Sequence, residues 1–163
     1  MVAFRAGTQI ETNDGLKAVE ILTRGDMIKT TSGFVPLARL MVSEPSVNDQ
    51  YFVLFPQHCT GNNVPNLDLY VTKHHLMVFD YKLLPCEQFV GKVENVSIEV
   101  LQEKQYNLIF ETQEYIHVHG LLFVTHHPNH PVHGLQHDEY FDPLKYRPGV
   151  FYEMVTKYVD IFT

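Results

Sequence analysis

Short runs of β-branched and aromatic residues, separated by turn signals, restrict this chain to a β-rich fold. Residues 8–12 alternate in polarity and stop at Asn13-Asp14-Gly15. The next run, at 18–22, ends at the turn Arg24-Gly25-Asp26 and is followed by a run at 27–30. This spacing favours many short antiparallel strands in one all-β unit over parallel strands joined by helices.

Further strands are expected beyond residue 33, with one loop-rich region among them. Residues 43–67 are rich in Ser, Pro, Asn and Gly around a single apolar run, which predicts a strand at 51–55 flanked by long loops. The other expected strands lie at 34–42, 68–79, 92–101, 105–110 and within 115–124, where Gly120 separates a pair of them.

The composition changes at the end of this β region. Prolines and a glycine interrupt residues 126–134 and exclude a helix interior there. Apolar residues between 150 and 162 then recur at helical spacing. The sequence therefore predicts a β domain at 1–125 and a second region at 126–163 that ends in one amphipathic helix.

Charge and size limit the function classes. The 163 residues carry 12 Lys and Arg against 19 Asp and Glu, a net charge of −7, which argues against a nucleic-acid binder held by phosphate contacts. No apolar run approaches the ~20 residues of a membrane-spanning helix, so no transmembrane segment is expected. The two cysteines, Cys59 and Cys86, allow at most one disulfide; a buried free thiol is the default for Cys86.

The opening of the chain carries a specific pattern. It reads Ala3-Phe4-Arg5-Ala6-Gly7-Thr8, followed by the turn glycine Gly15 and by Leu22-Thr23-Arg24-Gly25-Asp26. This pattern resembles the first motif of the Hint superfamily, the self-processing fold of hedgehog C-terminal domains and inteins. That motif normally starts with a nucleophilic cysteine, and Ala3 stands in its place.

Two later segments extend the resemblance over roughly residues 3–125. Residues 69–78 contain Thr72 and His75 in the Thr-x-x-His arrangement of the second motif, and 106–121 is similar to the last hairpin of the fold. The resemblance implies a pseudo-twofold horseshoe of short antiparallel strands. The most similar types are hedgehog-like and Vint (von Willebrand A–Hint) domains, in which 126–163 would be an adduct-recognition-like region.

The resemblance also implies a reaction. In the family a thiolate attacks the carbonyl of the preceding residue and forms a thioester, which a second nucleophile then cleaves. By position, His75 protonates the leaving amide nitrogen, Thr72 orients the same peptide, and Glu87 activates the second nucleophile. Asn107 would orient the scissile peptide. An Asn that merely begins a strand and has no catalytic role is an equal alternative. For Thr72 and His75, the alternative is that both residues are structural: Thr72 is an ordinary strand residue, and His75 is a core residue whose hydrogen bonds are satisfied.

Ala3 removes the nucleophile, so the chain as given is expected to be inactive. Either the natural protein lacks it, or cysteine was replaced to trap the precursor; the intact remainder of the motif favours replacement. Splicing is not expected, because residues 121–127 contain no Asn and Asn129 precedes His130 rather than a nucleophile. The expected reaction is cleavage before residue 3, with release of the upstream segment or its transfer to a nucleophile.

The partners expected for this reaction are an upstream domain of the same precursor and a small nucleophile or adduct molecule. A monomer without cofactor or metal is expected. A histidine cluster follows the β domain and forms a candidate ligand-binding set: His126, His127, His130, His133 and His137. Protonated imidazoles there would attract a polyanion. A Zn²⁺ site is disfavoured because the prolines prevent a helical alignment, and a solvated linker is the plainest reading.

Two other function classes stay open. The chain is alternatively a non-catalytic ligand-binding module on a Hint scaffold, using the His-rich C-terminal region. A His-metal hydrolase is the third hypothesis, which metal analysis of the purified protein decides.

Overall fold

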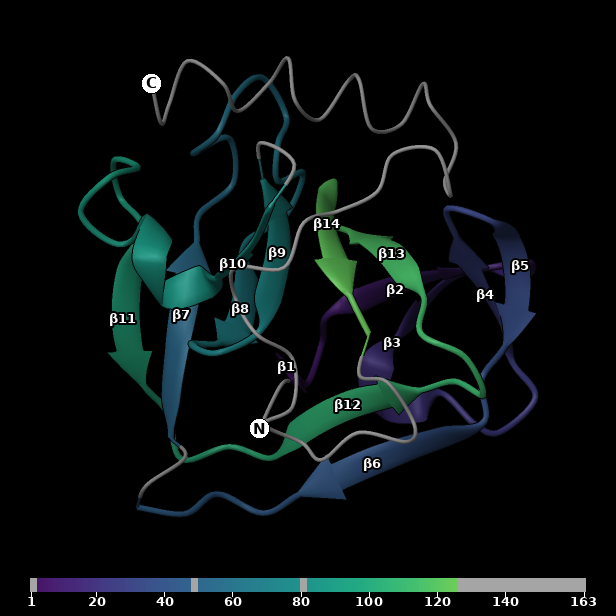
Figure 1. The fold of residues 1–163 in the computed structure, drawn as a ribbon. Coiled ribbons are helices and arrows are strands. Elements are labelled where there is room, and N and C mark those ends of the chain that lie inside the picture. Colours follow the sequence, from purple (N-terminus) through teal and green to yellow (C-terminus); the bar gives the residue numbers. More distant parts are fainter. Residues whose placement is uncertain (1–2, 48–49, 80–81, 126–163) are drawn as a thin grey trace.

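The structure is a computed structural model and describes residues 3–47, 50–79 and 82–125 (Figure 1). Within these residues, every pairing between strands is antiparallel, which confirms the all-β class. The helical elements of the described ranges are two short 3₁₀ helices, η1 (Val19–Ile21) and η2 (Cys86–Phe89). No helix in this part of the chain has the length and apolar character needed to span a membrane.

The largest sheet has six strands and places the first strand of the chain in its interior. In spatial order its strands are β11 (Ser97–Val100), β7 (Tyr51–Phe55), β8 (Leu69–Thr72), β1 (Phe4–Arg5), β12 (Gln105–Ile109) and β6 (Arg39–Ser43). β12 and β6 run side by side along the lower edge of Figure 1. The two-residue strand β1 therefore pairs with β8 on one side and with β12 on the other.

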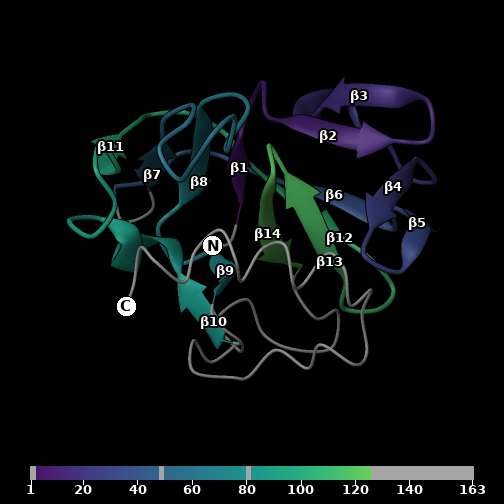
Figure 2. The same cartoon turned by 90° about the horizontal axis from the view of Figure 1, so that it is seen from above.

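Two four-stranded sheets complete the described structure. One has the order β10 (Lys82–Pro85), β9 (Leu76–Phe79), β14 (Leu121–Val124) and β13 (Tyr115–Val118). The other has the order β3 (Gly15–Ala18), β2 (Gln9–Thr12), β4 (Met27–Thr30) and β5 (Gly33–Pro36). Figure 2 shows β2 to β5 on the side of the molecule opposite β7, β8 and β11.

The strands β9 and β14 lie within the hydrophobic core. All four residues of each strand are buried, so these strands are covered on both faces, as their continuous apolar runs require. β14 pairs with β9 through Phe123 and Met77. His75 immediately precedes β9, and its side chain is buried with an exposed fraction of only 2%.

Residues 18–22 do not form the strand that their composition favoured. β3 ends at Ala18, and the chain then turns through η1. The 3₁₀ turn buries Val19 and Leu22 and leaves Ile21 exposed, while the Val19 amide donates to the Thr8 carbonyl at 2.8 Å. Burying two apolar residues three positions apart requires a helical turn, because a strand would have placed them on opposite faces.

Candidate active site

Ala3 lies in the interior, immediately before β1. Its exposed fraction is 0%, and its amide donates a hydrogen bond to Thr72 Oγ1 at 2.9 Å. In return, the Thr72 amide donates to the Ala3 carbonyl at 3.0 Å. Both polar groups of residue 3 are thus held by one threonine across the β1–β8 boundary, so the orientation of the backbone at this residue is fixed.

The Thr-x-x-His spacing corresponds to a tight turn after β8. Thr72 is the last residue of β8, and its carbonyl accepts a hydrogen bond from the His75 amide at 3.0 Å. The turn returns the chain into β9, so His75 follows Thr72 into the interior. His74, within the turn, points outward with 56% of its side chain exposed.

The imidazole of His75 packs against two aromatic rings that also contact each other. Its centroid is 4.7 Å from that of Phe4 and 5.1 Å from that of Phe123. Neither Nδ1 nor Nε2 has a hydrogen-bond partner among the described residues. The backbone at Val124 and at Ala3 lies near enough to favour the protonated ring without reaching good hydrogen-bond geometry. Burial dominates and lowers the pKa of His75 to about 4.

A neutral His75 suits proton transfer. Because the neutral imidazole carries a proton on one nitrogen and a lone pair on the other, it can donate and accept hydrogen bonds. A ring that keeps both nitrogens without partners in a buried setting is costly unless a reacting group supplies them. The environment therefore fits His75 for exchanging a proton with the backbone at residue 3.

Asn107 approaches the same place from the opposite neighbour of β1. Phe4 pairs with Tyr106 of β12, and continuing this register by one residue sets Asn107 opposite Ala3. Asn107 is buried, and its Nδ2 has no hydrogen-bond partner within the described ranges. Ala3, Thr72, His75 and Asn107 are therefore brought together, although they come from three separate stretches of sequence.

Glu87 is not part of this group. It lies in η2, where its carboxylate is 3.5 Å from Nδ1 of the exposed His74. The backbone of η2 does contact the Thr72–His75 turn, since the Cys86 amide donates to the His75 carbonyl at 2.9 Å. The carboxylate of Glu87, however, lies on the surface beside His74, so neither of its oxygens is in the buried site. Cys86 and Cys59 are both free thiols, so no disulfide links them.

The other sequence-predicted site residues, His126, His127, His130, His133 and His137, lie outside the described residues, as does the expected terminal helix. In the part of the chain that the structure describes, no three metal-ligating side chains lie together.

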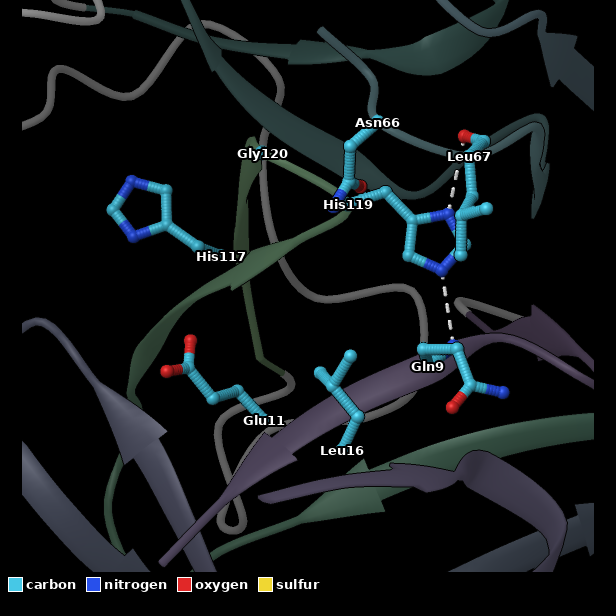
Figure 3. A pocket seen from close by; sticks show the side chains of 8 residues that line it. All are labelled: Gln9, Glu11, Leu16, Asn66, Leu67, His117, His119 and Gly120. Atoms are coloured by element: carbon cyan, nitrogen blue, oxygen red, sulfur yellow. Dashed lines mark hydrogen bonds between the residues drawn. The ribbon is translucent and has the colours of Figure 1, made fainter. Parts of the chain in front are cut away.

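His119 is a buried histidine to which the sequence assigned no role. Figure 3 shows its ring between Gln9 and Leu67: Nε2 accepts from the Gln9 amide at 3.0 Å, and Nδ1 lies 3.3 Å from the Leu67 carbonyl. An acceptor Nε2 places the proton on Nδ1, and burial lowers the pKa of the ring. His119 thus joins β2 to the loop before β8.

A pocket of about 180 Å³ lies beside His119, and Figure 3 shows the side chains that line it. Its lining consists of Gln9, Glu11, Leu16, Asn66, Leu67, His117, His119 and Gly120. The sequence signal that marks this place is the His-Gly pair between two apolar runs, which is typical of a two-residue hairpin turn. Neither the ring contacts nor the pocket follow from that signal.

Comparison with known proteins identifies the family and the fold. The Hint domain family model matches residues 2–130. A bacterial intein-like domain from Clostridium thermocellum has a similar structure, with a TM-score of 0.59 and 20% identity, covering 77% of this chain and 99% of that domain. The gp41-1 intein is similar with a TM-score of 0.56 and 13% identity, covering 76% of this chain and 98% of the intein.

A third similar structure is a glutathione-linked, splice-inactive variant of the AceL NrdHF class 3 split intein. Its TM-score is 0.53 at 14% identity, and the match covers 77% of this chain and 97% of that one. No curated protein matches the sequence significantly. At these identities the solved structures establish the shared fold, and the family model establishes membership. The chain therefore belongs to the Hint domain family.

Proposed function

We propose that this chain is a self-processing domain that cleaves the peptide bond before residue 3 when that residue is cysteine. Membership of the Hint domain family supports self-processing in general. The observation that carries the specific proposal is the pair of hydrogen bonds that fix the backbone of Ala3 on Thr72 beside the buried His75. With alanine at residue 3 the chain is proposed to be inactive.

The proposed reaction begins with an N-to-S acyl shift. The thiolate of a cysteine at residue 3 attacks the carbonyl carbon of residue 2, and the bond from that carbon to the residue 3 nitrogen breaks. The nitrogen leaves as an amine and takes a proton, which the neutral His75 supplies. Thr72 Oγ1 already accepts the hydrogen of this nitrogen and so fixes the orientation of the scissile peptide. Asn107 is proposed to orient the same peptide through its unpartnered Nδ2.

The second step is release or transfer rather than splicing. Water, a thiol or an adduct molecule attacks the thioester carbon, the carbon–sulfur bond breaks, and the thiol at residue 3 is restored. Splicing would require a cyclising Asn followed by a nucleophile after the last strand, and the sequence has none there. The role of Glu87 in activating this nucleophile stays a prediction, because its carboxylate pairs with the surface residue His74.

The test restores the nucleophile in the full chain fused behind a passenger segment. The Ala3→Cys precursor is expected to split on addition of a small thiol, and the Ala3 precursor is expected to stay intact under the same conditions. Adding His75→Ala to the Ala3→Cys precursor should reduce cleavage by at least about 100-fold, the usual contribution of a positioned general acid. Gel electrophoresis over time gives both rates.

The control is His74→Ala, which changes the neighbouring exposed histidine and should leave cleavage unchanged. A folded Ala3→Cys precursor that resists thiol contradicts the proposal. Equal cleavage rates for His75→Ala and its parent remove His75 from the mechanism. Circular dichroism of each variant establishes that it is folded.

A non-catalytic binding module is the second candidate, and Ala3 is the observation that favours it. In that case the His-rich region would bind a polyanion more tightly as pH falls below about 6.5, the ordinary pKa of histidine. Titration with polyphosphate between pH 5.5 and 7.5, with a variant that ends at Thr125 as control, tests this. Binding that does not vary over this range argues against it.

A further inference from the structure

The strand that positions residue 3 has little backbone pairing of its own. β1 contains only Phe4 and Arg5, and its pairing with β8 joins Phe4 to Val71. Yet this strand delivers residue 3 to Thr72, and a strand of two residues frays readily unless side chains anchor it. Phe4 supplies one anchor in the core, with its ring edge-on to Phe123 at 5.4 Å between centroids.

Arg5 supplies an anchor on the other neighbour of the strand. Its Nε and Nη2 donate to the two carboxylate oxygens of Glu103, the second of these bonds measuring 3.0 Å. Its guanidinium carbon also lies 4.4 Å from the centroid of the Tyr70 ring. Glu103 lies just before β12, and Tyr70 is in β8. A single side chain thus connects β1 to both strands that flank it.

The geometry suits local ordering rather than overall stability. The side chains of Arg5 and Glu103 are 33% and 36% exposed, and ion pairs at such positions contribute little to the free energy of unfolding. A planar guanidinium that is bidentate on a carboxylate and stacked on a ring nevertheless fixes the direction of its own backbone. Arg5 is two residues from the position where the proposed reaction occurs.

We infer that Arg5 is a positioning residue, whose contacts with Glu103 and Tyr70 hold β1 so that residue 3 stays aligned on Thr72. This inference rests on the proposed function for its chemical consequence, but its structural content is independent of that function. Loss of the contacts of Arg5 with Glu103 and Tyr70 leaves the domain folded, but residue 3 then separates from Thr72 more often.

Amide hydrogen exchange in the full chain with Ala3 tests the ordering directly. Arg5→Lys keeps the charge and removes the bidentate, stacked geometry. The Ala3 and Thr72 amides should then exchange about threefold to tenfold faster, as expected for weakened local closure, while the Thr125 amide and the thermal midpoint stay nearly unchanged. The matched control is Glu44→Gln, which removes the exposed Lys104–Glu44 pair of 3.5 Å beside Glu103.

Cleavage in the Ala3→Cys precursor provides the second measurement. Arg5→Lys and Glu103→Gln should each slow thiol-induced cleavage about threefold to tenfold, in line with the exchange effect, whereas Glu44→Gln should not. Unchanged exchange at Ala3 and Thr72 overturns the inference, and so does a uniform rise at all amides. If the precursor never cleaves, the proposed function fails, and the exchange result still decides whether Arg5 orders β1.

Discussion

His75 is the residue whose environment departs most from that of an ordinary side chain of its type. Burial lowers its pKa to about 4, so the folded state binds its proton less readily than the unfolded chain, where the pKa is ordinary. The unfolded state then binds more protons between about pH 6.5 and pH 4, and folding stability falls as pH falls through that window. His119, with its pKa lowered by burial, contributes in the same direction.

This gives a prediction for the free energy of unfolding. Between pH 7 and pH 4 the folded chain should lose about 3 kcal/mol through His75, and a His75→Gln variant should lack that part of the slope. Urea unfolding at a series of pH values measures it, with His74→Gln as the exposed control. An unchanged pH slope in His75→Gln would show that the ring is not held neutral by the fold.

The residues in and near the site differ in how well the sequence predicted their positions. Thr72 and His75 were identified because their spacing is local, and a three-residue turn places both in the interior. Asn107 is buried on the strand beside β1, and its role in orienting the scissile peptide stays a prediction. Glu87 was expected at the site, but a surface partner holds its carboxylate. His119 was overlooked because Gln9, its partner, is 110 positions away, and no local pattern reports such a contact.

At the scale of elements, the turns decide which strands pair. The expected strands at 51–55 and 105–110 are confirmed as β7 and β12, and the pair within 115–124 is confirmed as the β13–β14 hairpin. Alternation and turn residues are local signals and gave these strands. They failed at 18–22, where a long-range bond from Val19 to Thr8 and burial of Leu22 select a 3₁₀ turn.

The β13–β14 turn provides a prediction at this scale. His119 and Gly120 have φ values of 52° and 93°, a left-handed pair that glycine adopts without strain. A Cβ at Gly120 would meet only Val64 Cγ1, at 3.7 Å, so strain rather than a clash governs the cost. Gly120→Ala should therefore lower the free energy of unfolding by about 1–2 kcal/mol.

Gly120→Asn is the matched variant, because Asn tolerates the left-handed region better than Ala. It should recover part of the stability lost in Gly120→Ala, as measured by urea unfolding at neutral pH. If the two variants are equally stable, backbone strain is not what selects glycine at this turn.

At the scale of the whole molecule, the arrangement of strands creates the site. β1 lies between β8 and β12, so the first residues of the domain end in its interior, near residues about 70 and 105 positions further along the chain. The composition predicted one β domain of about this size, but sheet order depends on such distant pairings and was not predictable from local runs. The family resemblance implied a horseshoe of short antiparallel strands but not the order of the strands within each sheet.

The most direct test of the central claim is the chemical identity of the bond that breaks. The Ala3→Cys precursor, treated with hydroxylamine, should release a passenger whose mass corresponds to a hydroxamate at residue 2, and a domain fragment that begins with cysteine at residue 3. Mass spectrometry of both fragments measures this. Fragments cut at any other bond, or an intact folded precursor, would contradict the claim that this fold activates the amide before residue 3.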